Sequence, residues 1–140
     1  MAGIVTRRVD ARVEFHDVDA MGVAHNARYL LWFEMGRLAL LEEVLPLRWA
    51  LERRIAAPVV ASRCEHLAPA GYGDALAITT RHRKADRWGG RFAFEHSVSN
   101  RATKVELCRG STEITVVDAG SGRPLRDLPP EVWERYLGLT

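Results

Sequence analysis

With 140 residues, the chain is long enough for a single domain, spanning residues 1–140, with a proper hydrophobic core. Its net charge of +2 comes from scattered arginines without a basic patch, which argues against a nucleic-acid partner. No apolar run reaches the ~18 residues of a membrane span, and no secretion signal opens the sequence, so we expect a cytoplasmic protein away from the membrane.

The first predicted elements are a strand and a long helix. Residues Ile4–Phe15 alternate between apolar and polar side chains, which is typical of a half-buried strand. Asn26 suits the N-cap of a helix, and the helix is expected to run from Ala27 to about Val44, before Pro46 ends it. Its apolar residues cover more than one stripe, so it has to be covered on more than one side, most simply by a curved sheet.

The rest of the chain is predicted to be β structure joined by short turns. Four strands are expected, at Ala57–Leu67, Ala75–Ala85, Arg91–Ser99 and Lys104–Val117. A short C-terminal helix is expected to start near Pro130 and to run through Tyr136. Because short hairpins make neighbouring strands antiparallel, the chain is predicted to be α+β, with a five-stranded antiparallel sheet against one long helix.

Polar side chains are densest between the first strand and the helix. They are His16, Asp17, Asp19, His25 and Asn26. An Asp in such a loop commonly bonds nearby N–H groups, but a carboxylate there can also act as a nucleophile or a general base. The first N–H groups of a helix lack intrahelical partners and carry the positive end of its dipole, so they can stabilise an oxyanion.

The same stretch resembles a known family. The motifs Asp17–Gly22 (DVDAMG), Asn26–Tyr29 (NARY) and Trp32–Glu34 (WFE) resemble the 4-hydroxybenzoyl-CoA thioesterase branch of the hotdog-fold acyl-CoA thioesterases. The resemblance implies a hotdog fold, in which the sheet curls round the helix. It also implies hydrolysis of acyl-CoA to a carboxylic acid and CoA, without a cofactor, in a homodimer or homotetramer with sites at the subunit interface.

The resemblance also implies roles for individual residues. It places the catalytic carboxylate at Asp19 and an oxyanion-binding backbone N–H at Asn26, and it leaves Asp17 structural. Contacts with the substrate are expected from Gly22, Val23, His25, Tyr29 and Glu34. Many relatives have a polar residue at the position of Val23. Glu34 has two interpretations, since it either reaches solvent or an ion-pair partner, or lines the pocket.

Binding of CoA calls for cations that contact its phosphates. The resemblance points to Arg87 and Arg91 beside a glycine hairpin, and to Arg126 near the C-terminus. Cys64 and Cys108 are too few for a disulfide framework and lack metal-ligand spacing, so we expect free thiols and no metal site.

Two other functions stay open at this point. The first is hydrolysis of acyl groups from acyl carrier protein. The second is a non-catalytic acyl-CoA-binding or protein-binding module on the same fold. The length and aromaticity of the acyl group are also open.

Overall fold

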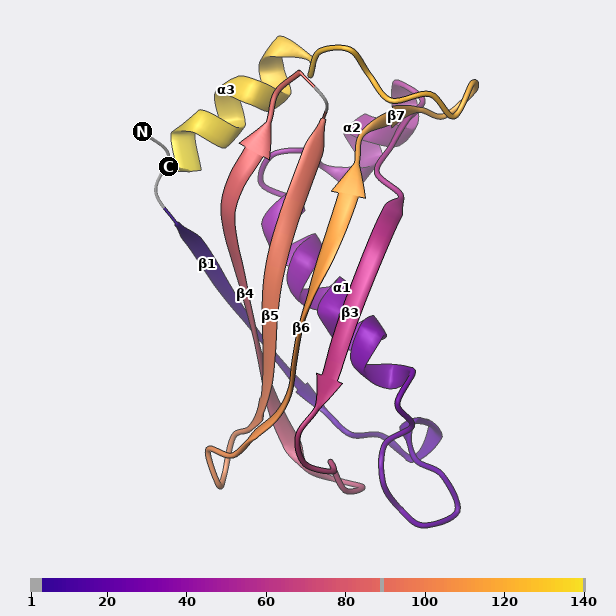
Figure 1. The fold of residues 1–140 in the computed structure, drawn as a ribbon, viewed down its shortest axis with the longest axis vertical. Coiled ribbons are helices and arrows are strands. Elements are labelled where there is room, and N and C mark those ends of the chain that lie inside the picture. Colours follow the sequence, from indigo (N-terminus) through magenta and orange to yellow (C-terminus); the bar gives the residue numbers. More distant parts are fainter. Residues whose placement is uncertain (1–3, 89, 140) are drawn as a thin grey trace.

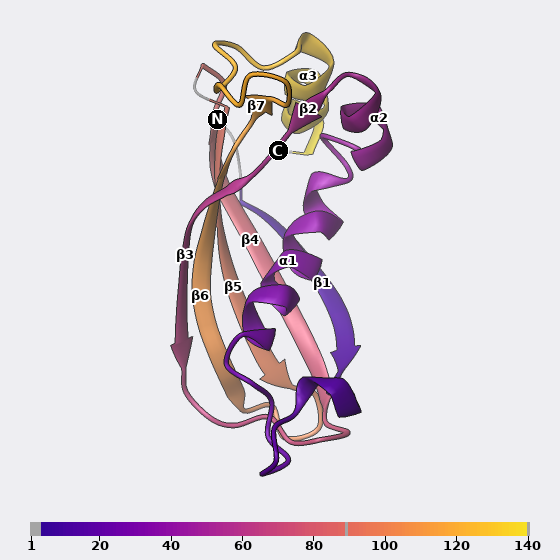
Figure 2. The ribbon, with the colours of Figure 1, turned by 90° about the vertical axis from the view of Figure 1, so that its right-hand side faces the viewer.

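The computed structural model describes residues 4–88 and 90–139. A five-stranded antiparallel sheet, in the strand order β1-β4-β5-β6-β3, curves along one long helix, α1 (Figures 1 and 2). The sheet consists of β1 (Val5–Arg12), β3 (Val59–His66), β4 (Ala75–Asp86), β5 (Arg91–Asn100) and β6 (Glu106–Thr115). The other elements are the 3-10 turn η1 (Phe15–Asp17), α1 (Arg28–Leu41), α2 (Leu47–Glu52), α3 (Pro130–Leu139), and the pair β2 (Ile55–Ala56) and β7 (Val117–Asp118).

Helix α1 buries one side against the sheet and leaves apolar side chains on the other. Trp32, Phe33 and Leu40 are buried in the interface with the sheet. Gly36 allows the close approach, because a Cβ at that position would overlap the Thr80 hydroxyl of β4. Leucines and a methionine on the opposite side of α1 are exposed. No helix among the described residues is both long and apolar enough to cross a membrane.

Buried and exposed side chains alternate along the strands of the sheet, as the sequence pattern predicts. On β5, the side chains of Phe92, Phe94, His96 and Val98 are buried toward the core, whereas those between them are largely exposed. Helix α3 closes one end of this core, where the Tyr136 ring packs edge-on against Phe92 with ring centroids 5.8 Å apart. The predicted five-stranded sheet, long helix and short C-terminal helix are therefore confirmed.

Several predicted boundaries are wrong. The first strand ends at Arg12 instead of Phe15, because the Asp17 carboxylate accepts a hydrogen bond from the Glu14 N–H (2.8 Å) and closes the η1 turn. Phe15 is consequently 80% exposed. The β2–β7 ribbon was not predicted, since two-residue strands carry no usable alternation.

A polar group lies in the core beneath α1. The His96 ring bonds the Thr80 hydroxyl through Nδ1 (2.9 Å) and the Thr112 hydroxyl through Nε2 (2.7 Å), and it stacks on Phe33. The buried Arg37 guanidinium also donates to the Thr112 hydroxyl (3.3 Å). Burial lowers the pKa of His96 to about 4, and the Arg37 charge acts in the same direction.

This shift predicts a pH-dependent loss of stability. The unfolded chain binds a proton on His96 near pH 6.5, whereas the folded chain resists it until about pH 4. The stabilisation from neutral His96 is therefore complete above about pH 6.5 and is lost as the pH falls toward about 4, by roughly 3 kcal/mol. Urea unfolding at several pH values should show a smaller decline for His96→Gln than for the wild type. Parallel declines would contradict the prediction, and the exposed His16→Gln serves as the control.

Candidate active site

The loop between β1 and α1 is anchored by Asp17. Besides bonding the Glu14 N–H, this buried carboxylate lies 3.4 Å from the Arg28 guanidinium at the start of α1. The Arg28 guanidinium also donates to the His16 carbonyl (2.9 Å), and the Asp17 carbonyl accepts the His25 N–H (2.9 Å). These contacts close the loop at its base and fix the direction in which the helix begins. We therefore assign a structural role to Asp17.

Asp19 lies in the hairpin-like tip of this loop. Its Oδ1 accepts hydrogen bonds from the Met21 N–H (2.8 Å) and the Val23 N–H (3.4 Å). Its backbone N–H donates to the Val23 carbonyl (2.9 Å). Within the described residues, Oδ2 makes no hydrogen bond. Oδ1 thus stabilises the conformation of the loop, while Oδ2 is available to act as a nucleophile or a base.

The helix start differs from the prediction in one respect. Helix α1 begins at Arg28 with Ala27 at the N-cap position, and no side chain caps it. The prediction that Asn26 is the N-cap is therefore wrong. The Asn26 side chain is exposed. The backbone N–H of Asn26 donates to no acceptor in the part of the chain that the structure describes. This backbone donor remains available to an oxyanion, together with the positive end of the helix dipole.

The other loop residues shape the backbone. Gly22 has φ +77°, a left-handed conformation that favours glycine, and its carbonyl accepts the Tyr72 N–H (3.1 Å). Val23 forms an isolated bridge with Gly71, which docks the loop onto the segment before β4. His25 is exposed beside the helix start.

Two predicted contacts lie on opposite sides of α1. Tyr29 is only 3% exposed, and its ring packs against those of Trp32 and His66, each at a centroid distance of 4.9 Å. Tyr29 therefore belongs to the hydrophobic core of the chain. Glu34 is exposed on the outer side of α1, which agrees with the solvent-facing interpretation for the isolated chain. Glu34 could line a pocket only if another surface covered α1.

The three candidate arginines lie at the end of the sheet far from Asp19. Arg12 at the end of β1 pairs with Ala75 at the start of β4, so the Asp19 loop lies at that end. Arg87 and Arg91 flank the other end of β4, a strand of 12 residues that spans roughly 40 Å (Figure 1). Within a single chain, these arginines therefore lie too far away to contact the site at Asp19.

The arginines also differ in their partners. Arg87 pairs with Asp127 (2.9 Å), and Arg91 pairs with Glu113 (3.1 Å). Arg126 is exposed and forms no ion pair with any residue that the structure describes.

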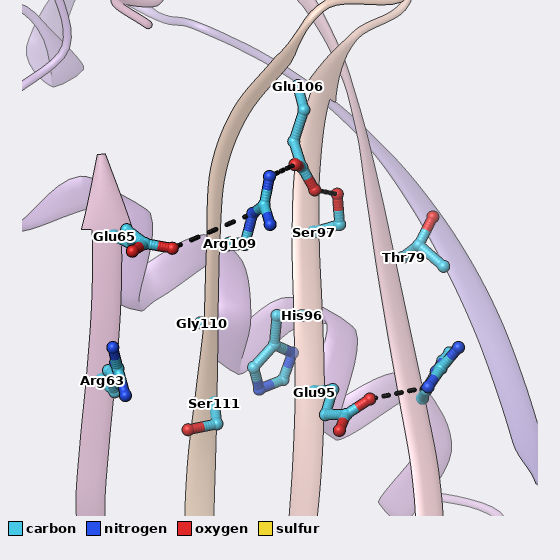
Figure 3. A pocket seen from close by; sticks show the side chains of 11 residues that line it. Arg63, Glu65, Thr79, Glu95, His96, Ser97, Glu106, Arg109, Gly110 and Ser111 are labelled. Atoms are coloured by element: carbon cyan, nitrogen blue, oxygen red, sulfur yellow. Dashed lines mark hydrogen bonds and ion pairs between the residues drawn. The ribbon is translucent and has the colours of Figure 1, made fainter. Parts of the chain in front are cut away.

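A hollow of about 600 Å³ lies on the sheet face away from α1 (Figure 3). Its charged side chains pair with one another, since Arg81 contacts Glu95 and Arg109 contacts Glu106, each at 2.8 Å. The hollow contains none of the predicted site residues. We therefore retain the loop before α1, and not this hollow, as the candidate active site.

Comparison with known proteins decides the family. The model of the thioesterase-like superfamily matches residues 13–135. The chain belongs to this superfamily. Putative acyl-CoA thioesterase YneP of Bacillus subtilis (strain 168) is 27% identical over 118 residues, which cover 84% of this chain and 83% of YneP.

Solved structures show the same fold as this thioesterase. A probable thioesterase from Bartonella henselae has a TM-score of 0.76 and 29% identity, covering 89% of this chain and 99% of its own. Slr0204, a 1,4-dihydroxy-2-naphthoyl-CoA thioesterase from Synechocystis, has a TM-score of 0.81 and 22% identity, covering 97% and 96%. The predicted family, hotdog fold and thioester-hydrolase activity are confirmed.

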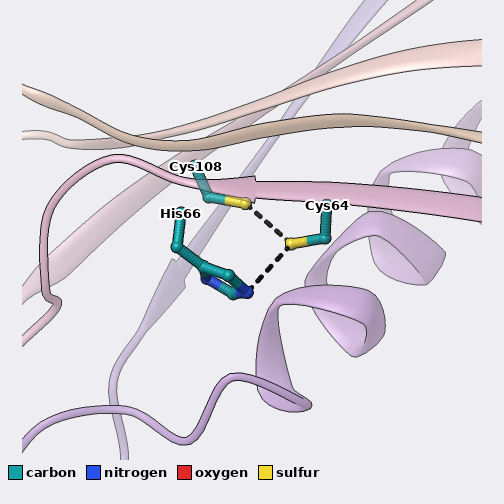
Figure 4. Close-up of side chains that lie close together, drawn as sticks. All are labelled: Cys64, His66 and Cys108. Atoms are coloured by element: carbon teal, nitrogen blue, oxygen red, sulfur yellow. Dashed lines mark hydrogen bonds between the residues drawn. The ribbon is translucent and has the colours of Figure 1, made fainter.

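One group of side chains in this thioesterase was not predicted from the sequence. Cys64, His66 and Cys108 meet on the α1 side of β3 and β6 (Figure 4). Burial, with a smaller contribution from Cys64, raises the pKa of the Cys108 thiol. This thiol is therefore neutral at pH 7 and unsuited to nucleophilic attack. The Cys64-x-His66 spacing on β3 was the one signal for this group in the sequence. Cys108, its third residue, comes from another strand, β6.

Proposed function

We propose that this thioesterase hydrolyses acyl-CoA in the cytoplasm, with Asp19 as the reacting carboxylate. The observation that carries the proposal is the geometry of Asp19, whose Oδ1 is held by two loop N–H groups while Oδ2 is unbonded within the described residues. The loop leads directly into the N-terminus of α1. The likeness to YneP supports CoA as the leaving group.

The reaction consumes one water and gives a carboxylic acid and free CoA. Ionised Asp19 either attacks the thioester carbonyl carbon itself or takes a proton from the water that does so. The electron pair moves to the carbonyl oxygen, where the Asn26 N–H and the positive end of α1 stabilise the oxyanion. When the carbonyl re-forms, the C–S bond breaks and the CoA sulfur leaves and takes up a proton. If Asp19 attacks first, water then hydrolyses the acyl-enzyme anhydride.

We propose that a second copy of the chain covers α1 and completes the site. Leu30, Leu31, Met35 and Leu38 on the outer side of α1 are each 40–46% exposed. Within the described residues, β3 lies at one edge of the sheet and pairs on one side only, with β6; its residues Val59 and Val60 are also exposed. An exposed apolar stripe and an open strand edge are both features that association covers. A homodimer, or a homotetramer built from it, meets both needs.

Antiparallel pairing of β3 with its copy would also explain the position of the arginines. In such a pair the two sheets run in opposite directions, so one end of each sheet lies beside the other end of its partner. The end that holds Arg87, Arg91 and Arg126 in one copy would then point toward the Asp19 end of the other. The phosphates of CoA could contact these arginines while the thioester lies at Asp19.

Replacement of Leu31 by arginine should dissociate the oligomer. We expect the wild type to sediment as a dimer or tetramer at micromolar concentration, and Leu31→Arg to sediment mainly as a monomer with little hydrolytic activity. Leu51→Arg, at an exposed leucine of α2, is the matched control and should leave the assembly intact. A stable wild-type monomer with full activity would contradict the proposed interface.

Replacement of Arg126 by alanine should weaken the binding of acyl-CoA. We expect the Michaelis constant to rise roughly fivefold with turnover nearly unchanged, because a remote phosphate contact binds ground state and transition state alike. Arg87→Ala and Arg91→Ala should have smaller effects, since each arginine already has a carboxylate partner. Arg8→Ala, on β1 at the sheet edge opposite β3, is the control. An unchanged Michaelis constant in all three test variants would contradict this assignment.

The direct test of the proposed function is release of the free CoA thiol from a panel of acyl-CoAs. The panel should include short, long and aromatic acyl groups, and the same acyl groups should be offered on acyl carrier protein. We expect hydrolysis of at least one acyl-CoA that exceeds hydrolysis of its carrier-protein counterpart. A preference for the carrier-protein thioesters throughout would reassign the leaving group, and no hydrolysis of either set would refute the proposal.

A further inference from the structure

Two thiols and one imidazole converge between the edge strand β3 and its neighbour β6. The Sγ atoms of Cys64 and Cys108 are 3.0 Å apart, and the Cys64 Sγ lies 3.6 Å from the His66 Nε2. All three potential ligand atoms lie within 4.8 Å of one another (Figure 4). Cys108 is fully buried, Cys64 is half-buried and His66 is exposed.

The strand register explains why these three side chains meet. Cys64 and His66 are two residues apart on β3, so both point to the same face of the sheet. Across the two strands, His66 is paired with Cys108, and Cys64 is paired with Gly110, two residues further along β6. Cys108 therefore lies diagonally opposite Cys64, and their thiols meet on this face of the sheet. Tyr29 of α1 packs against the His66 ring and holds it on this side.

We propose that Cys64, His66 and Cys108 bind one divalent ion of the zinc class. Zinc takes thiolate ligands at about 2.3 Å and imidazole ligands at about 2.0–2.1 Å in tetrahedral geometry, so its sulfur ligands lie roughly 3.8 Å apart. The two Sγ atoms need to separate by less than about 1 Å from the observed 3.0 Å to meet this value. The thiols release their protons to solvent on binding. Water fills the fourth position on the exposed side of His66.

The same register argues against a disulfide between the cysteines. Cys64 and Cys108 are diagonal neighbours, since each is directly paired with a different residue. Diagonal residues of an antiparallel pair lie roughly 7–8 Å apart, whereas unstrained disulfides join Cα atoms about 4.4–6.8 Å apart. A bridging ion spans this longer separation, and it gives the aligned imidazole a role that a disulfide would leave unexplained.

The bound ion would fasten the edge strand of the sheet. Within the described part of a single chain, β3 pairs with β6 alone, and its last residue, His66, packs on the first turn of α1. An ion shared by β3 and β6 would hold both strands beneath that turn. This role is independent of the reaction proposed above. It differs from the sequence-based expectation of no metal site.

The test uses the full chain, stripped of metal under reducing conditions and titrated with Zn²⁺ against a chromogenic chelator. We expect one ion per chain and a higher melting temperature for the loaded protein. Cys64→Ser, His66→Asn and Cys108→Ser should each weaken binding at least about tenfold. His25→Asn removes an exposed histidine outside the cluster and should bind like the wild type. With Co²⁺, the wild type should show a thiolate-to-cobalt charge-transfer band that Cys64→Ser diminishes.

Several outcomes would overturn the site. They are absence of stoichiometric binding, binding that none of the three substitutions weakens, and a Cys64–Cys108 disulfide that forms in the presence of reductant and zinc. Because His66 is exposed, the His66→Asn variant should fold normally. Its zinc affinity therefore tests the site even if Cys108→Ser does not fold. None of these readouts depends on thioester hydrolysis, so failure here and failure of the proposed function are distinguishable.

Discussion

Asp19→Asn is expected to lower the turnover of acyl-CoA hydrolysis at least ~100-fold while the chain stays folded. The amide oxygen of the variant can still accept the Met21 and Val23 N–H bonds that Oδ1 accepts in the wild type. The variant loses the negative charge and the basicity, which both the nucleophilic and the general-base route require. Steady-state kinetics and thermal melting of the same preparations are the measurements.

Asp17→Asn is the matched control, because it makes the same chemical change two residues away. Asp17 is buried against Arg28 and the Glu14 N–H, so this substitution should lower the melting temperature. It should lower turnover much less than Asp19→Asn does. If Asp19 only shapes the loop, Asp19→Asn would be nearly silent. A well-folded Asp19→Asn enzyme with near wild-type turnover would contradict the mechanism, and Glu34 would become the next candidate base.

Gly110→Ala is expected to destabilise the fold by about 3 kcal/mol, at the upper end of what overpacking costs. A Cβ on Gly110 would overlap the carbonyl oxygen of Arg63 on β3, and it would lie 2.7 Å from the Phe33 ring. Neither neighbour can move easily, since one is strand backbone and the other is fully buried beneath α1. The melting temperature should fall by roughly 10 °C.

Gly138→Ala tests whether the loss comes from this contact. Gly138 lies near the end of α3, and a Cβ there would meet no atom within 4 Å. The helix propensity of alanine should make that variant neutral or slightly more stable than the wild type. If Gly110→Ala and Gly138→Ala melt at the same temperature, the close packing of β3, β6 and α1 is not the constraint inferred here.

Regular elements with a clear period could be predicted from the sequence. The alternation in β5 predicts a strand from Arg91 to Ser99, one residue short of its observed end. The apolar surface of α1 predicts a helix covered on more than one side, and the structure shows the sheet on one side and an exposed apolar stripe on the other. These properties depend only on local periodicity and burial, which a single sequence carries.

Features set by particular hydrogen bonds could not be predicted. Alternation continues to Phe15, but the strand stops at Arg12 because the Asp17 carboxylate turns the chain. Asn26 has the right chemistry for an N-cap, yet the helix begins one residue later than that position requires. In the same way, the meeting of Cys64 with Cys108 depends on the register between β3 and β6, which linear spacing does not encode.

We propose that the thioester reacts between Asp19 and the N-terminus of α1. The most direct test of this proposal is a crystal structure of Asp19→Asn with an acyl-CoA bound. We predict the thioester carbonyl oxygen about 3 Å from the Asn26 N–H, with the amide at position 19 facing the carbonyl carbon and the CoA phosphates on arginines of the second copy. An acyl-CoA whose thioester occupies the hollow on the outer face of the sheet, away from position 19, would contradict this site.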